Sequence, residues 1–208
     1  MHKKQLFTGG ESLDIAEKIL IMVHGRGGNA RDILTLADYF DLEGFTFLAP
    51  QATNDTWYPF SFMVPPKQNE PWLGSALSLL KDVVSDLNAK GFKNEKIYFL
   101  GFSQGACLTL EFITRNATKY GGVIAFTGGL IGDSINKDNY KGDFEGTKIF
   151  LSSGDPDPHV PIERVNATEE ILKEMNAQVT KMIYKNRPHT ITSDELLKAR
   201  EFVFSFTT

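Results

Sequence analysis

The 208-residue sequence is poor in the features that several classes of protein require. Cys107 is the only cysteine, which excludes a disulfide within the chain and a metal site built from several thiolates. The basic residues near the N-terminus are not followed by an apolar segment, and no apolar run is long enough to span a bilayer. We therefore expect a cytoplasmic protein without a signal peptide or membrane insertion.

The sequence also lacks the marks of a nucleic-acid or nucleotide partner. Its net charge is −4, and the 22 Lys and Arg residues are scattered, so we expect no nucleic-acid partner. The Lys-Ser or Lys-Thr pair of a P-loop is absent, and Gly25, Gly27 and Gly28 do not fit the spacing of a dinucleotide fingerprint. These absences favour a small-molecule partner.

Apolar strand patterns and helical patterns alternate along the chain. Short apolar runs predict strands at 6–8, 18–23, 44–49, 97–100, 123–126, 148–152 and 178–184. Apolar residues at helical spacing predict helices at 32–40, 72–91, 106–117, 162–176 and from 193 onwards. This alternation is typical of an α/β fold with a mostly parallel central sheet and helices on both faces, and the length fits a single domain over residues 1–208.

Residues 51–71 follow neither pattern and are rich in aromatic residues and proline. Long loops within compact domains are usually functional or disordered, and the many aromatic residues disfavour disorder. We interpret the segment as a cap over a substrate site, and a satellite core cluster is the alternative. Exposed aromatic side chains here would also suit a homodimer contact. The expected substrate-binding residues are His24, Trp57, Tyr58, Phe62 and Trp72.

A serine between two glycines joins the strand at 97–100 to the helix that follows. The sequence Gly101-Phe102-Ser103-Gln104-Gly105 leaves only one or two residues for this turn, which forces a strained backbone at Ser103 and leaves no room for side chains two positions away. The hydroxyl of Ser103 would then project beside a helix N-terminus, as a nucleophile does. The alternative is an ordinary turn that happens to contain a serine.

A glycine-rich loop, 24–29, follows the predicted central strand at 18–23. Its His-Gly start resembles the loop that supplies one oxyanion N–H group in serine hydrolases, while the second comes from the residue after the nucleophile. We therefore expect the backbone amides of Arg26 and Gln104 to form an oxyanion hole. The Arg26 side chain would either bind an anionic group of the substrate or pair with Glu70 or Asp55 and hold the cap.

Three predicted loops at the carboxyl ends of strands carry a serine, an acidic turn and a histidine, in that order. Serine is a poor nucleophile until a base takes its proton, and a carboxylate must hold the imidazole in the correct tautomer. Ser103 and His189 fit the first two roles, and such chemistry needs no metal or organic cofactor. On the residues alone, either Asp155 or Asp157 fits the third role, because aspartate before proline also braces turns.

The chain resembles the phospholipase/carboxylesterase family of α/β-hydrolases, which includes acyl-protein thioesterases and small bacterial carboxylesterases. The similarity lies in residues 24–27, 101–105, 154–161 and 189–190. It implies the α/β-hydrolase fold, with Ser103 as nucleophile, His189 as base and Asp157 as acid. The chain departs from the family pattern at Arg187-Pro188, where glycines are common, and at Arg26, where acyl-protein thioesterases have leucine.

The resemblance implies a serine carboxylesterase that acts through an acyl-enzyme intermediate. The aromatic cap favours esters with small to medium acyl or aryl groups. A lysophospholipase or an acyl-protein thioesterase is the alternative, and a hydrolase-fold binding protein without catalysis is a minor one. We expect Cys107, four residues after Ser103, to be a small buried helix residue.

Overall fold

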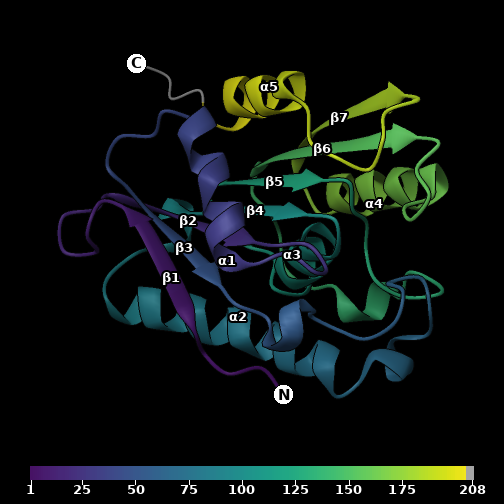
Figure 1. Ribbon diagram of the computed structural model, residues 1–208, viewed down its shortest axis with the longest axis horizontal. Coiled ribbons are helices and arrows are strands. Elements are labelled where there is room, and N and C mark those ends of the chain that lie inside the picture. Colours follow the sequence, from purple (N-terminus) through teal and green to yellow (C-terminus); the bar gives the residue numbers. More distant parts are fainter. Residues whose placement is uncertain (205–208) are drawn as a thin grey trace.

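The computed structural model describes residues 1–204, whose strands form one sheet between two layers of helices (Figure 1). The strands are β1 (Leu6–Gly10), β2 (Lys18–Val23), β3 (Phe45–Pro50), β4 (Ile97–Phe102), β5 (Gly122–Phe126), β6 (Lys148–Asp155) and β7 (Gln178–Lys185). The α-helices are α1 (Ala30–Leu34), α2 (Trp72–Ala89), α3 (Gln104–Arg115), α4 (Ile162–Glu174) and α5 (Ser193–Val203). None of the helices within residues 1–204 is long and apolar enough to cross a membrane.

The seven strands are ordered β1-β3-β2-β4-β5-β6-β7. β1 runs antiparallel to β3, and every other neighbouring pair is parallel. The carboxyl ends of β2, β4, β6 and β7 therefore lie along one edge of the sheet, where ligands bind in open α/β folds. This topology confirms the predicted mostly parallel sheet.

Side chains that alternate along the central strands supply two cores, one on each face. In β2, Ile19 and Ile21 face one core, and Leu20 and Met22 face the other. The first core also contains buried residues of α2, α3 and α4, whereas the second contains those of α1 and α5. Figure 1 shows these two helical layers, and they confirm the prediction of helices on both faces.

The predicted elements are all present, with small shifts at their ends. The helix expected at 32–40 is a short α1 capped by Asn29, followed by a 3₁₀ turn over Thr35–Tyr39. The first strand, predicted at 6–8, continues through Gly9 and Gly10 to form the edge strand β1. β6 continues three residues beyond the predicted end at Ser152 and carries the chain directly into the acidic turn.

Residues 51–71 contain two 3₁₀ turns, Thr53–Asp55 and Pro66–Asn69, and otherwise run as irregular backbone. Trp57, Tyr58 and Phe62 are buried, as the satellite-cluster alternative required, but they join the main core that contains α2 and do not form a separate cluster. Phe60 is the aromatic residue of this segment that is exposed, at 55%. The exposed aromatic surface proposed above as a dimer contact is therefore much smaller than the sequence suggested.

Candidate active site

Ser103 lies at the turn between β4 and α3, with a positive φ angle that residues other than glycine rarely adopt. Its φ and ψ are 54° and −120°, in a region that costs about 1–3 kcal/mol for a residue with a side chain. The turn is held because the Ser103 amide donates to the Phe126 carbonyl at 2.9 Å and the Cys107 amide donates to the Ser103 carbonyl at 3.0 Å. The strain predicted from the sequence is therefore present.

Gly101 and Gly105 flank this turn because no side chain fits at either position. A Cβ atom on Gly105 would lie 2.1 Å from the Val23 carbonyl oxygen, and one on Gly101 would lie 2.5 Å from the Gly105 carbonyl oxygen. Both contacts are with backbone, which has no room to move aside. The two glycines thus let α3 pack directly on the ends of β2 and β4.

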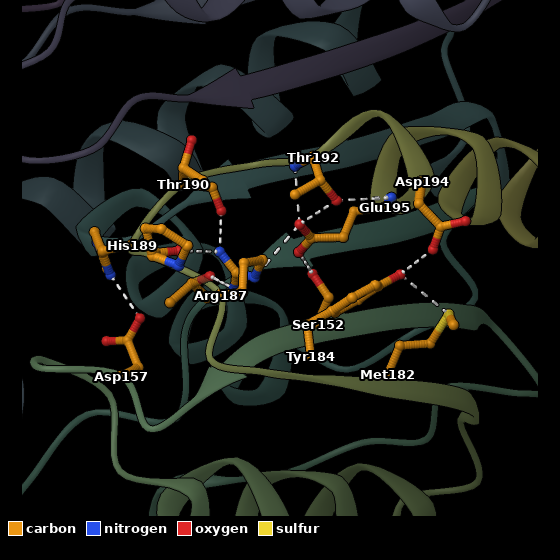
Figure 2. Close-up of polar contacts among 12 residues, drawn as sticks. Ser152, Asp157, Met182, Tyr184, Arg187, His189, Thr190, Thr192, Asp194 and Glu195 are labelled. Atoms are coloured by element: carbon orange, nitrogen blue, oxygen red, sulfur yellow. Dashed lines mark hydrogen bonds and ion pairs between the residues drawn. The ribbon is translucent and has the colours of Figure 1, made fainter.

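The structure brings Ser103, His189 and Asp157 into one line of hydrogen bonds. His189 Nε2 lies 2.8 Å from Ser103 Oγ, and His189 Nδ1 lies 2.9 Å from Asp157 Oδ2. The contact between His189 and Asp157 is drawn in Figure 2. Because a carboxylate only accepts hydrogen bonds, Nδ1 carries the proton, and Nε2 is left to accept one from the serine hydroxyl.

Asp157 is held as a carboxylate by the turn in which it lies. Its Oδ1 accepts the backbone N–H groups of His159 and Val160 at 2.9 and 3.0 Å. Burial alone would raise the pKa of Asp157, but these two bonds and the one from His189 outweigh it and lower the pKa below its usual value. The side-chain bonds that brace the turn thus come from Asp157, whereas Asp155 contributes its backbone carbonyl to Asn186.

Arg26 and Gln104, whose backbone amides are the expected oxyanion donors, line the same cavity as Ser103. Within residues 1–204, neither amide donates a hydrogen bond, so both are available to a ligand. The loop that carries Arg26 lies against the serine turn, because a Cβ atom on Gly25 would be 3.4 Å from that of Ser103. Two free amides beside a serine hydroxyl are the arrangement that an oxyanion hole requires.

The side chain of Gln104 has a role that the sequence did not indicate. Its Oε1 accepts the Trp57 amide at 2.9 Å, and its Nε2 donates to the Tyr58 carbonyl at 2.8 Å. The residue after Ser103 therefore also ties the cap segment to the start of α3. A glutamine beside a serine carries no sequence signal for such contacts, because its partners lie 46 and 47 residues away.

The Arg26 side chain holds the cap, but through other partners than those expected. Its guanidinium donates to the backbone carbonyls of Tyr58, Pro59 and Phe60 at 2.7–2.9 Å. The suggested pairing with Glu70 or Asp55 is wrong. Three consecutive carbonyls of an irregular loop lack backbone partners, and the guanidinium fork satisfies them together.

A cavity of about 440 Å³ opens beside Ser103, a size typical of small-ligand sites. Residues 58–62 of the cap form one wall, and Pro158, His159 and Val160 form part of another. Cys107 lies 1% exposed against the same cavity, and burial raises the pKa of its thiol to about 12, so it is neutral near pH 7. Within residues 1–204, no group of His, Cys, Asp and Glu side chains is suited to hold a metal ion.

Two of the five residues expected to bind substrate, Tyr58 and Phe62, line this cavity. His24, Trp57 and Trp72 do not, because they are used to build the base of the cap. The imidazole of His24 accepts the Ala52 amide and packs on the Trp57 ring at 5.0 Å. On the other side, the ring of His2 lies 5.3 Å from those of both Trp57 and Trp72.

His159 also lies at the site, although it is not among the residues expected there. Its ring meets that of His189 edge to face with centroids 5.0 Å apart, and it borders the cavity. The position follows from the acidic turn, which places residue 159 beside the loop of His189.

The sheet order and the site at the carboxyl ends of its strands define the α/β-hydrolase fold.

Comparisons with known proteins agree with this fold. A family model described as Phospholipase/Carboxylesterase matches residues 11–206. The structure of a phospholipase/carboxylesterase from Dyadobacter fermentans is 52% identical, covers 98% of both chains and superposes with a TM-score of 0.96. The chain therefore belongs to the phospholipase/carboxylesterase family, which consists of ester hydrolases.

More distant relatives include acyl-protein thioesterases. Acyl-protein thioesterase 1 of Saccharomyces cerevisiae is 32% identical over 137 residues, which cover 65% of this chain and 60% of the yeast protein. The match thus spans less than two thirds of that relative. The carboxylesterase of Bacillus cereus covers 95% of this chain and 92% of its own with a TM-score of 0.77, and at 20% identity it shows the shared fold alone.

Proposed function

We propose that the protein is a serine carboxylesterase that acts through an acyl-enzyme intermediate. The observation that carries the proposal is the unbroken line of hydrogen bonds from Asp157 through His189 to Ser103, at a serine with φ of 54°. A strained serine aimed at an imidazole nitrogen is costly to maintain and has no evident structural purpose. Nucleophilic catalysis accounts for both features.

In the first half of the reaction, the oxygen of Ser103 attacks the ester carbonyl while His189 Nε2 takes the hydroxyl proton. The carbonyl oxygen becomes an oxyanion, which the amides of Arg26 and Gln104 stabilise, and each such donor is typically worth about 10²–10³ in rate. The Asp157 carboxylate stabilises the imidazolium that forms. The imidazolium then gives its proton to the alcohol as the carbon–oxygen bond breaks.

In the second half, water replaces the alcohol. His189 takes a proton from the water, the hydroxide attacks the acyl carbonyl, and the same two amides hold the second oxyanion. Collapse releases the carboxylic acid and returns the proton to Ser103. In both halves of the reaction, His189 is the residue that accepts the proton and gives it back. We propose that the reaction takes place in the cytoplasm.

The walls of the cavity favour esters with small to medium acyl or aryl groups. Tyr58, Phe62 and Val160 give it apolar surface, and the cap is fastened by the side chains of Arg26 and Gln104. A fastened wall restricts long chains more than a mobile one does. Hydrolysis of acyl thioesters is a second candidate, because relatives of this chain include the yeast acyl-protein thioesterase.

A series of p-nitrophenyl esters from acetate to palmitate, assayed on the wild type and on Ser103→Ala, tests the proposal. We expect turnover of the short esters, a burst of p-nitrophenol matching the enzyme concentration, and loss of both in Ser103→Ala. Activity that survives in Ser103→Ala would contradict the serine mechanism. Preferential turnover of palmitate or of palmitoyl thioesters would contradict the assigned substrate size and support the thioesterase alternative.

A further inference from the structure

Arg187 is buried in a loop whose neighbouring residues are exposed. It is 6% exposed, whereas Asn186 and Pro188 on either side of it face solvent. Its guanidinium reaches back to the chain around His189, where one nitrogen donates to the carbonyls of Pro188, at 2.9 Å, and of Thr190. Both flanks of His189 are therefore bonded to one side chain, and Figure 2 shows its contact with Thr190.

The same guanidinium is also anchored to residues outside its own loop. Its second terminal nitrogen donates to Thr127 Oγ1 at 2.7 Å, just beyond β5. Its Nε lies 3.5 Å from Oε2 of Glu195, a carboxylate with no exposed surface in the first turn of α5. The ion pair thus connects the loop of His189 to α5, and the hydrogen bond to Thr127 connects it to the end of β5.

Glu195 is fixed by three further hydrogen bonds. Its Oε1 accepts the hydroxyl of Ser152 in β6 at 2.6 Å, and its Oε2 accepts both the amide and the hydroxyl of Thr192 at 2.9 Å. Thr192 caps α5, so the bonds between it and Glu195 form a capping box. Figure 2 shows the carboxylate between Ser152, Thr192 and Arg187.

Two buried charges are an expensive way to fix a surface loop. Burying an ion pair usually stabilises a protein no more than apolar side chains of the same volume would. The arrangement here instead supplies directional bonds, which an apolar residue does not. These bonds end on the carbonyls on either side of His189, where a shift of about 1 Å costs about 10²-fold in rate.

We propose that Arg187 is a positioning residue that holds His189 in line with Ser103 and Asp157, and that Glu195 holds Arg187. The inference rests on the proposed function, since it assigns His189 the role of base. It predicts that removal of the guanidinium lowers kcat by about 10²-fold and leaves KM within about threefold of the wild type. Arg187→Lys keeps the positive charge but loses the several N–H donors of the guanidinium. Its kcat is therefore expected to lie between that of the wild type and that of Arg187→Met.

The test is the hydrolysis of p-nitrophenyl acetate by the full chain carrying Arg187→Met, Arg187→Lys or Glu195→Gln. Arg115→Met is the matched control, because Arg115 pairs at 2.7 Å with another buried carboxylate, Glu111, away from the cavity. Thermal unfolding verifies that each variant is folded at the assay temperature. Should Arg187→Met fail to fold, the two conservative variants carry the comparison.

An NMR spectrum of the imidazole protons provides a readout that does not depend on activity. The proton on His189 Nδ1, bonded to Asp157, is expected as a far-downfield signal in the wild type and in Arg115→Met, and to be lost or broadened in Arg187→Met. A His189→Gln variant assigns the signal. This measurement reports the alignment of the ring directly, whether or not an ester is hydrolysed.

The outcomes separate the inference from the proposed function. A selective fall in kcat together with loss of the downfield signal supports the inference. It is overturned if folded Arg187→Met keeps its kcat and its signal, if KM alone changes, or if Arg115→Met loses as much kcat. A wild type without activity on any ester would contradict the proposed function, and the NMR comparison would still decide the role of Arg187.

Discussion

The serine turn and the histidine loop present their reactive atoms 2.8 Å apart, yet they are held in different ways. Ser103 is placed by backbone: a strand, two glycines and a helix N-terminus leave it one conformation. His189 lies in a loop between β7 and α5 and is placed by side chains, chiefly those of Asp157 and Arg187. The first arrangement is local in sequence, and the second depends on contacts between distant elements.

This difference determines how each region tolerates substitution. A side chain on either glycine of the serine turn clashes with backbone and has nowhere to go. A substitution near His189 leaves the backbone space intact and removes a bond or a charge. We therefore expect changes in the first region to reduce stability and changes in the second to reduce kcat in a protein that remains folded.

Asp157→Asn gives the largest expected effect on the histidine side of this comparison. The amide NH₂ group of asparagine can donate to Nδ1 and favour the wrong imidazole tautomer, so kcat should fall by about 10⁴-fold at little cost in stability. Kinetics with p-nitrophenyl acetate measure the loss. Asp155→Asn is the control and should keep its kcat. A loss of about 10⁴-fold in Asp155→Asn would contradict the assignment of Asp157 as the acid.

Gly105→Ala gives the largest expected effect on the serine side. The new Cβ atom would lie 2.1 Å from the Val23 carbonyl oxygen, so β2 or α3 must shift, at a cost of about 3 kcal/mol or more. Chemical denaturation measures the change in the free energy of unfolding. In Gly9→Ala the Cβ atom meets only the Phe47 side chain at 3.6 Å, and that variant should change stability by less than about 1 kcal/mol.

Arg26→Met tests whether the cap, like the loop of His189, is held by side-chain bonds whose loss reduces activity in a protein that remains folded. Loss of bonds to the Tyr58, Pro59 and Phe60 carbonyls should loosen the cavity wall and lower kcat/KM by about tenfold. Because the guanidinium is occupied by these carbonyls, we expect an equal loss for neutral and anionic esters. A loss confined to anionic esters would instead mean that Arg26 binds the substrate. Arg31→Met, away from the cavity, is the control.

The smallest expected effect is a change in the pH dependence of stability. Burial lowers the pKa of His24 below its usual value of 6.5, so the unfolded chain takes up a proton there before the folded chain does. Stability should therefore fall as the pH drops below about 6.5, and the imidazole would lose its capacity to accept the Ala52 amide. His24→Gln should flatten this slope in thermal unfolding between about pH 7.5 and 5.5. An unchanged slope in that variant would place the pH dependence elsewhere.

The sequence predicted the fold better than it predicted the cap. Strands and helices have their own periodicity, so the alternating pattern revealed nearly every element to within a few residues. The aromatic residues of 51–71 carry no such pattern. The prediction that Trp57 binds substrate was wrong, because its side chain is buried against His24 and does not line the cavity. Which side of an irregular loop faces a site depends on the surface beneath it.

The sequence alone determined the elements and the geometry of Ser103, because strand, glycines and helix act within about ten residues of one another. It left Asp155 and Asp157 equivalent until the family resemblance favoured one, because they differ by only two positions in a turn. Only the tertiary structure decided that Asp157 faces His189, 32 residues away, and that His189 faces Ser103, 86 residues away. Such contacts follow from the order of strands in the sheet and the packing of their loops, which no local pattern encodes.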